Sequence, residues 1–240
     1  MPKKKMHFIL LLTSIFASIV FISGCVEEVY VDELKRPDCT VRFMQADPTY
    51  GPVTFSIYGR FEEENTVVAT ATVDYASVSG YLTIPAGARK VTIQGSGLNS
   101  TVTVTFTSYW QSTLTLRNGN LSNLYERLNY SDEAYKLDDG AGEKGAIRFR
   151  NMMNFATYCG LDDGYFPSNA TIAVGASTTY YAVKKGTHDF WNFTGTPGTT
   201  SYVEYGELEG FDVDGNVRYT IAAFGTATNP VLKIFKDDGK

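Results

Sequence analysis

The sequence predicts an all-β protein with two tandem antiparallel β-sandwich domains, immunoglobulin-like or transthyretin-like, behind a lipoprotein signal peptide. Three observations predict it: a two-residue hydrophobic period from Thr40 onward, frequent turn signals between short runs, and an internal duplication. A period of two is typical of strands that cover a core on one side. The predicted boundaries are 1–24 for the signal peptide, 25–39 for a tether, 40–137 for the first sandwich and 138–240 for the second.

The strand pattern is clearest over residues 53–58 and 101–107, where apolar side chains alternate with hydroxyl-bearing ones. Gly-containing turn signals separate such runs: they lie at 85–87, 95–97, 118–119 and 214–215. One stretch departs from this pattern, because Leu121, Leu124 and Leu128 recur at helical spacing and leave a short helix open.

The duplication is visible in three pairs of segments. Val41-Arg42-Phe43 matches Ile147-Arg148-Phe149, and both would open a sandwich. A Tyr-led strand before a Gly turn occurs at 81–87 and again at 180–186. Each half also ends in Asp-Asp-Gly. Repetition over about a hundred residues predicts two units of similar fold.

The N-terminal segment predicts where in the cell the protein is located. Lys3, Lys4 and Lys5 precede an apolar run over residues 8–22, which is the layout of a secretory signal peptide. The next residues, Ile22-Ser23-Gly24-Cys25, resemble the bacterial lipobox. The resemblance implies cleavage before Cys25, two or three acyl chains on that residue and a lasting membrane anchor. We therefore expect a lipid-anchored protein at the bacterial outer membrane or cell surface; an uncleaved anchor or an ordinary signal peptide are the alternatives.

Segments of the first half also resemble a known family. The segments at 41–48, 53–59 and 79–87, with 218–225 in the second half, are similar to domain-of-unknown-function family 4397. The resemblance implies tandem β-sandwich repeats in secreted and lipid-anchored bacterial proteins. It transfers no catalytic residue, since the family has no established activity, and the second half matches it less closely.

The net charge limits the kinds of partner the protein can bind, and the cysteine content limits its possible disulfides. The formal net charge is −5 and becomes more negative when the signal peptide leaves, so no basic stripe remains for nucleic acid. Cys39 and Cys159 remain beyond the anchoring cysteine. They could pair in an oxidising compartment or stay as two separately buried thiols, and the sequence leaves both open.

No residue set predicts an enzyme. His188 is the one histidine of the mature chain, and we interpret it as a turn or edge-strand residue; a hydrolase that depends on it is the alternative. No cofactor is expected, and one histidine with two distant cysteines does not predict a zinc site. Asp212, Asp214 and Asn216 have the opening spacing of a calcium loop, but a type I′ hairpin turn at Asp214-Gly215 is the simpler interpretation.

The aromatic residues indicate where a ligand could bind. There are 16 Tyr, 15 Phe and 2 Trp, and Trp110 and Trp191 are candidate stacking platforms for sugar rings, although a sandwich core would also use such residues. We expect a non-catalytic envelope or surface lipoprotein that acts as a binding, adhesion or scaffolding module, with an unknown protein or glycan partner. The alternatives are a carbohydrate-binding module and a pilin-like subunit that donates its C-terminal strand, residues 231–235.

Overall fold

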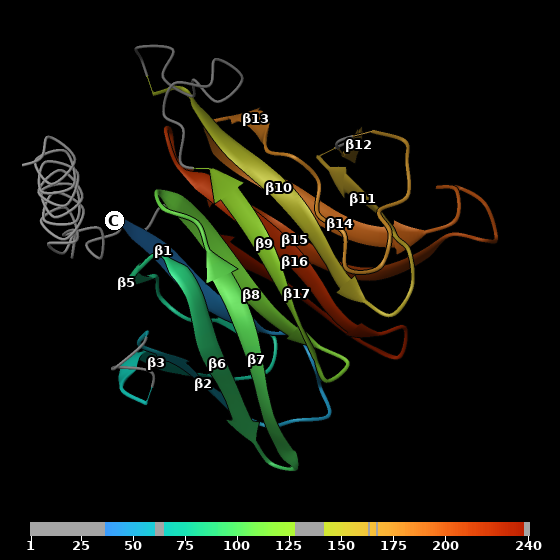
Figure 1. Cartoon of the computed structure of the whole chain (residues 1–240). Helices are drawn as coiled ribbons and strands as arrows, with labels where there is room; N and C mark the ends of the chain where they lie inside the picture. Colours follow the sequence, from blue (N-terminus) through green and yellow to red (C-terminus); the bar gives the residue numbers. More distant parts are fainter. Residues whose placement is uncertain (1–36, 61–64, 128–141, 163, 167, 238–240) are drawn as a thin grey trace, which may run out of the picture. The chain divides into compact units, whose positions relative to one another are not determined.

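The computed structural model describes residues 37–60, 65–127, 142–162, 164–166 and 168–237 (Figure 1). The residues described in these ranges belong to one compact unit. Cys25, the signal peptide and most of the predicted tether lie outside the described residues. Within the described ranges, no helix has the length and apolar character needed to cross a membrane.

Every regular element in these ranges is a strand, as the two-residue period predicts. The strands are β1 (Asp38–Gln45), β2 (Val53–Tyr58), β3 (Val67–Val73), β4 (Ser77–Val78), β5 (Leu82–Pro85), β6 (Gly87–Gly95), β7 (Leu98–Phe106), β8 (Trp110–Arg117), β9 (Asn120–Arg127), β10 (Lys144–Met153), β11 (Tyr158–Leu161), β12 (Gly164–Phe166), β13 (Tyr181–Lys184), β14 (Gly186–Thr194), β15 (Val203–Val213), β16 (Arg218–Thr226) and β17 (Asn229–Lys236).

The strands form four sheets, two in each sandwich. The first sandwich has an outer sheet in the order β3-β2-β6-β7 and an inner sheet in the order β4-β1-β8-β9, with β5 also paired to β1. The second has an outer sheet β12-β11-β14-β15 and an inner sheet β13-β10-β16-β17. A core lies between the sheets of each sandwich: the rings of Phe43 and Phe55 stack at 4.6 Å in the first, and those of Phe149 and Phe190 lie 5.5 Å apart in the second.

The two sandwiches repeat the same strand order. β1 pairs in parallel with β8, as β10 does with β16, and every other strand pairing in the described part is antiparallel. The first strand begins earlier than predicted, at Asp38, so Asp38 and Cys39 belong to β1 rather than to the tether. The predicted boundary between residues 137 and 138 lies outside the described residues.

Turn chemistry explains one hairpin and corrects another. Asn118 and Gly119 both have positive φ, 49° and 70°, which suits the type I′ turn that joins β8 to β9. Asp214-Gly215 is not the predicted hairpin turn: it connects β15 in the outer sheet to β16 in the inner sheet. The helix left open around Leu121 is also wrong. That segment is β9, because it pairs with β8 over its whole length.

The inner sheets are buried on both faces. In β10 every residue after Lys144 is buried, and β8 is buried from Gln111 to Leu116. The second face of each inner sheet packs against the other sandwich, and we call this contact the interface layer. One part of it is apolar and consists of Met44, Ala46, Ala76, Met152, Ala222 and Phe224. The interface layer therefore joins the two sandwiches as a core would.

The other part of the interface layer is charged. Asp237, directly after β17, is fully buried and forms an ion pair with Arg42 of the first sandwich. Its Oδ2 accepts hydrogen bonds from Tyr180 (2.7 Å) and Thr220 (2.5 Å) and lies 3.7 Å from Nη2 of Arg148. One carboxylate at the end of the chain thus contacts arginines from both sandwiches.

The charged part follows the sequence repeat. The guanidinium of Arg42 lies 4.9 Å from the ring centre of Tyr81, and that of Arg148 lies 4.6 Å from Tyr180. Arg42 Nε donates to Thr113 Oγ1 at 3.1 Å, and Arg148 makes the corresponding bond in the second sandwich. Burial opposes the charge on Arg42, but the combined effect of Asp237, Tyr81 and Tyr180 outweighs it and raises the pKa of that guanidinium. The duplicated Arg and Tyr positions therefore meet at the interface layer.

Candidate functional site

The outer sheet of the second sandwich carries a cluster of aromatic side chains on its solvent side. We call it the aromatic face, and it consists of Tyr158, Tyr165, Trp191, Phe193 and Tyr202. Alternation along β11 and β14 produces it: Cys159 and Phe190 point into the core and Asn192 is buried, so Tyr158, Trp191 and Phe193 point to the opposite side of the sheet. The strand register then sets Trp191 opposite Gly160 and Phe193 opposite Tyr158.

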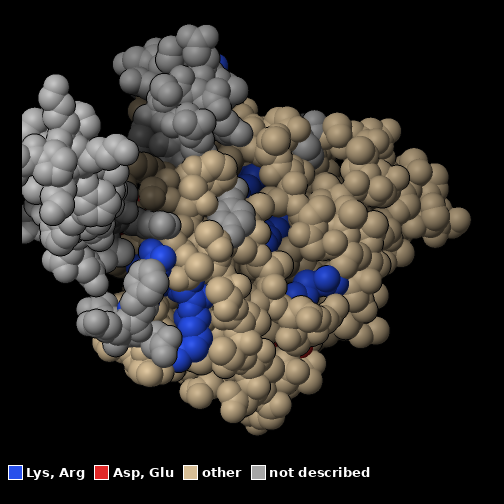
Figure 2. Space-filling view, viewed as in Figure 1, with Lys and Arg blue, Asp and Glu red and all other residues tan. Residues whose placement is uncertain are grey.

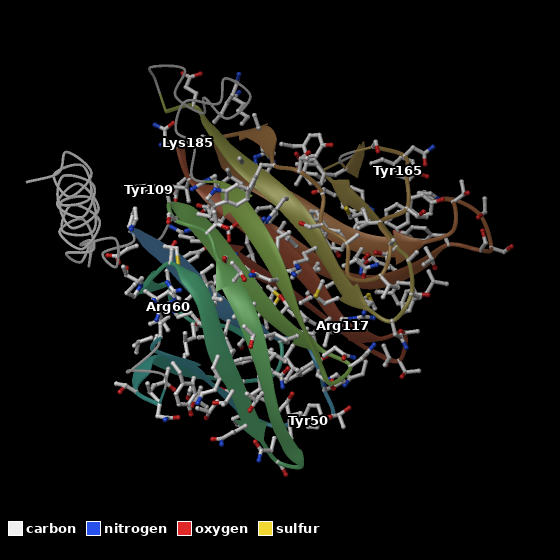
Figure 3. All side chains as sticks on the ribbon, viewed as in Figure 1. Tyr50, Arg60, Tyr109, Arg117, Tyr165 and Lys185 are labelled. Carbon is white, nitrogen blue, oxygen red and sulfur yellow. The ribbon has the colours of Figure 1, made fainter. Side chains whose placement is uncertain are left out.

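Phe193 is the centre of the aromatic face. Its ring stacks on Tyr158 at 5.6 Å with an interplanar angle of 18°, and it lies 5.6 Å from Tyr165 and 5.3 Å from Tyr202. These rings cover Phe193, which is only 1% exposed, whereas Tyr165 is 37% exposed. The cluster therefore has a buried centre and a partly exposed aromatic surface, on the part of the second sandwich where Figure 3 labels Tyr165.

Trp191 lies over a glycine. A Cβ atom at Gly160 would be 2.3 Å from Cε2 of the indole and 2.4 Å from Cζ2, so the ring occupies the space that any other side chain would need. Tyr165 pairs with Gly160 on the other side. The row across the sheet therefore reads Tyr165, Gly160, Trp191 and then Glu207.

Carboxylates flank the aromatic face along β15. Glu207 is paired opposite Trp191, and Glu204, opposite Phe193, accepts a hydrogen bond from the Tyr202 hydroxyl at 3.1 Å. Burial and this hydrogen bond to Glu204 raise the pKa of Tyr202 to about 12. Local desolvation and the nearby negative charges of Glu204, Glu209 and Asp189 raise the pKa of Glu207. The arrangement offers flat apolar rings beside hydrogen-bond acceptors.

The first sandwich has a different outer surface. Its outer sheet presents hydroxyl groups: Thr54 and Thr72 hydrogen-bond at 2.8 Å, and Ser56 and Thr70 at 3.2 Å. The adjacent stretch 99–105 exposes alternate polar side chains. The outer sheets of the two sandwiches therefore carry different side chains on their solvent sides. Figure 2 shows one side of the molecule, where Lys and Arg gather in small separate groups.

The two predicted stacking residues do not share a strand pair or a sheet. Trp191 belongs to the aromatic face, but Trp110 begins β8 in the inner sheet of the first sandwich and is half-buried. Its neighbour Tyr109 is 69% exposed and has a φ of 62°. Figure 3 shows Tyr109 and Tyr165 well separated. Sequence reasoning found Trp191 but missed the tyrosines of the aromatic face.

The two described cysteines are separate thiols, so the disulfide alternative is wrong. Cys39 lies in the core of the first sandwich and Cys159 in that of the second, and both are buried and free. Each sulfur donates to a carbonyl instead, Cys39 to Ile84 and Cys159 to Phe166. Burial raises the pKa of Cys39 to about 11 and raises that of Cys159 as well.

These thiols should resist modification. In the folded full chain at pH 8, we expect no reaction with Ellman's reagent, because burial blocks access and keeps both thiols protonated. Unfolding in guanidinium without a reductant should release two equivalents. A third equivalent would show that Cys25 is unmodified, and none would indicate a disulfide.

The candidate catalytic and metal residues have other partners. Nδ1 of His188 lies 2.8 Å from Asp162, and Nε2 lies 2.7 Å from the Lys184 carbonyl, so neither ring nitrogen is directed at a nucleophile. Asp212 accepts a hydrogen bond from Thr187 Oγ1 at 2.8 Å.

The turn after β15 has its own contacts. Asp214 accepts hydrogen bonds from Lys236 (2.9 Å) and Tyr219 (2.9 Å), which lower its pKa, and Asn216 takes the positive φ of the turn, 62°. Among the residues described, no group of three or more His, Cys, Asp or Glu side chains could hold a metal ion.

Comparison with known proteins adds little. No family model and no curated protein matches the chain, so the resemblance to family 4397 stays a prediction. Among solved structures, the chain is similar to the Bacillus anthracis TIE protein (10% identity, TM-score 0.27), where the match covers 79% of this chain and 34% of that one. It is also similar to the "putative cell adhesion protein" of Parabacteroides distasonis ATCC 8503 (7% identity, TM-score 0.26), with 82% and 97% covered.

The chain thus spans about a third of the length of the Bacillus anthracis protein. TM-scores this low carry no argument about function, which has to be inferred from the residues of this chain.

Proposed function

We propose that the protein is a non-catalytic binding module of the bacterial envelope, anchored through lipid on Cys25, that holds a carbohydrate on the aromatic face. The observation that carries the proposal is the set of half-buried rings around Phe193, with carboxylates beside them. Sugar rings present flat C–H surfaces and peripheral hydroxyls. Rigid aromatic rings with adjacent acceptors match both features.

A rigid sheet supports this proposal. The rings stand on paired β11, β14 and β15, and Phe193 is fully packed, so little side-chain freedom remains to be lost on binding. The absence of catalysis is part of the proposal: both nitrogens of His188 are already bonded to acceptors.

Donation of the C-terminal strand has less support. β17 pairs with β16 over eight residues, from Asn229 to Lys236, and Asp237 fixes its end in the interface layer. A strand paired along its whole length within its own chain is not available to a neighbour. The binding role is therefore preferred to a pilin-like role.

Replacing Trp191 with alanine should weaken carbohydrate binding by about 30-fold, or about 2 kcal/mol, as expected for a central aromatic contact. Binding is measured by a polysaccharide array followed by titration of the best glycan. The chain has 2 Trp, so Trp110→Phe leaves Trp191 as the sole emitter, and its emission should change on binding. Trp191→Phe leaves Trp110, and its emission should not respond.

Two results would overturn the proposal. One is a blank array across cell-wall and host polysaccharides, and the other is glycan affinity that Trp191→Ala leaves unchanged. Mass spectrometry of the N-terminus tests the anchor separately, since an unmodified Cys25 would remove the envelope attachment without affecting the aromatic face.

A further inference from the structure

The interface layer contains a second arginine of β10 that lacks the partners of its neighbours. Arg150 is 3% exposed, and neither its Nε nor its Nη1 has a hydrogen-bond acceptor. Arg42 and Arg148, by contrast, both contact Asp237. Buried donors are almost always paired in folded proteins, so two unpaired nitrogens on one buried cation indicate a missing acceptor.

The local charge balance indicates that the missing acceptor is negative. The charged groups that act on Arg150 are Arg148, Arg42 and Asp237, which are two like charges and one opposite charge. Asp237 is already occupied by Arg42, Tyr180 and Thr220. Burial and the neighbouring arginines lower the pKa of Arg150 to about 9, so the group is still cationic at neutral pH. A neutral water molecule would accept a hydrogen bond but would not offset this charge.

The strand partners of Arg150 supply no negative charge. In its own sheet, Arg150 pairs with Ala222 on β16 and forms an isolated bridge with Ser177. Neither residue carries a charge that could balance the guanidinium. Nε and Nη1 of one guanidinium are sufficient to hold a single-atom anion.

We propose that a small inorganic anion of the halide class binds in the interface layer against Nε and Nη1 of Arg150. The anion supplies a second negative charge, besides Asp237, to the charged part of the interface layer. It also makes the joining of the two sandwiches dependent on a bound ion. This site is separate from the aromatic face and does not depend on the function proposed for that face.

Thermal unfolding of the full chain in detergent tests the site. In sodium chloride, the Tm should exceed that in sodium gluconate at equal ionic strength, and should rise by roughly 3–5 °C for each tenfold increase in chloride above its Kd. Arg150→Met should remove this difference. Lys233→Met is the matched control: Lys233 is exposed on β17 and pairs with Ala222, so it loses the same charge in the same row of the sheet. It should keep the full chloride effect.

Equal Tm values in chloride and gluconate would overturn the proposal, as would a chloride effect that Arg150→Met leaves unchanged. If that variant does not fold, wild-type crystals soaked in bromide decide the question. An anomalous peak in contact with Arg150 supports the site, and a water molecule or no density at that position refutes it.

Discussion

Replacing Asp237 with asparagine is expected to lower the free energy of unfolding by about 3–5 kcal/mol, the range for breaking a fully buried ion pair. Asp237 is 0% exposed and is the carboxylate that Arg42 and Arg148 share. An asparagine of the same shape would leave both guanidinium groups without a counter-charge. It would also alter the bonds from Tyr180 and Thr220, which now end on Oδ2.

Guanidinium unfolding of the full chain, followed by tryptophan fluorescence, measures this loss. Asp212→Asn is the matched control, because Asp212 is exposed and bonds only Thr187 among the described contacts. Its unfolding free energy should change by less than about 0.5 kcal/mol. If Asp237→Asn resembled this control, the charged part of the interface layer would have to be open to water, contrary to its burial.

The sequence repeat identified the residues of this charged cluster but not their role. Arg42 and Arg148 stand between apolar residues that point into the core of each sandwich, so alternation predicts that both arginines face away from the core. In an isolated sandwich, that face would be exposed to solvent. The covering of one inner sheet by the other depends on contacts between residues far apart in the chain, such as Arg42 with Asp237. No local pattern carries that information.

The residues that make up the aromatic face could likewise not be predicted from local sequence pattern alone. Trp191 is a candidate from sequence because a tryptophan ring can stack on a sugar ring. Tyr158 and Tyr165 come from β11 and β12, and they join the cluster only through the register of β11 with β14 and β12. Trp110 has the same local signal as Trp191 but belongs to an inner sheet. Only strand pairing separates a binding candidate from a residue beside the interface layer.

Gly160→Ala should disable the aromatic face while every aromatic ring stays present. The new Cβ would lie 2.3 to 2.7 Å from three atoms of the Trp191 indole, so the ring has to move off the sheet. Gly160 is not among the residues with positive φ, and alanine therefore adds no backbone strain. We expect stability to fall by about 1–3 kcal/mol from overpacking. Carbohydrate affinity should fall about as far as in Trp191→Ala, because binding requires the position of the ring as well as its presence.

Both effects are measured in the Trp110→Phe background. The emission of Trp191 reports the position of its ring, and the glycan titration reports carbohydrate affinity. The displaced indole should emit at longer wavelength, since it leaves a half-buried position. Gly164→Ala on β12 is the control: no atom lies within 4 Å of its added Cβ, so emission and affinity should stay at wild-type values. Unchanged emission in Gly160→Ala would contradict the packing of Trp191 on Gly160. Shifted emission with full affinity would leave that packing intact and place carbohydrate binding elsewhere on the molecule.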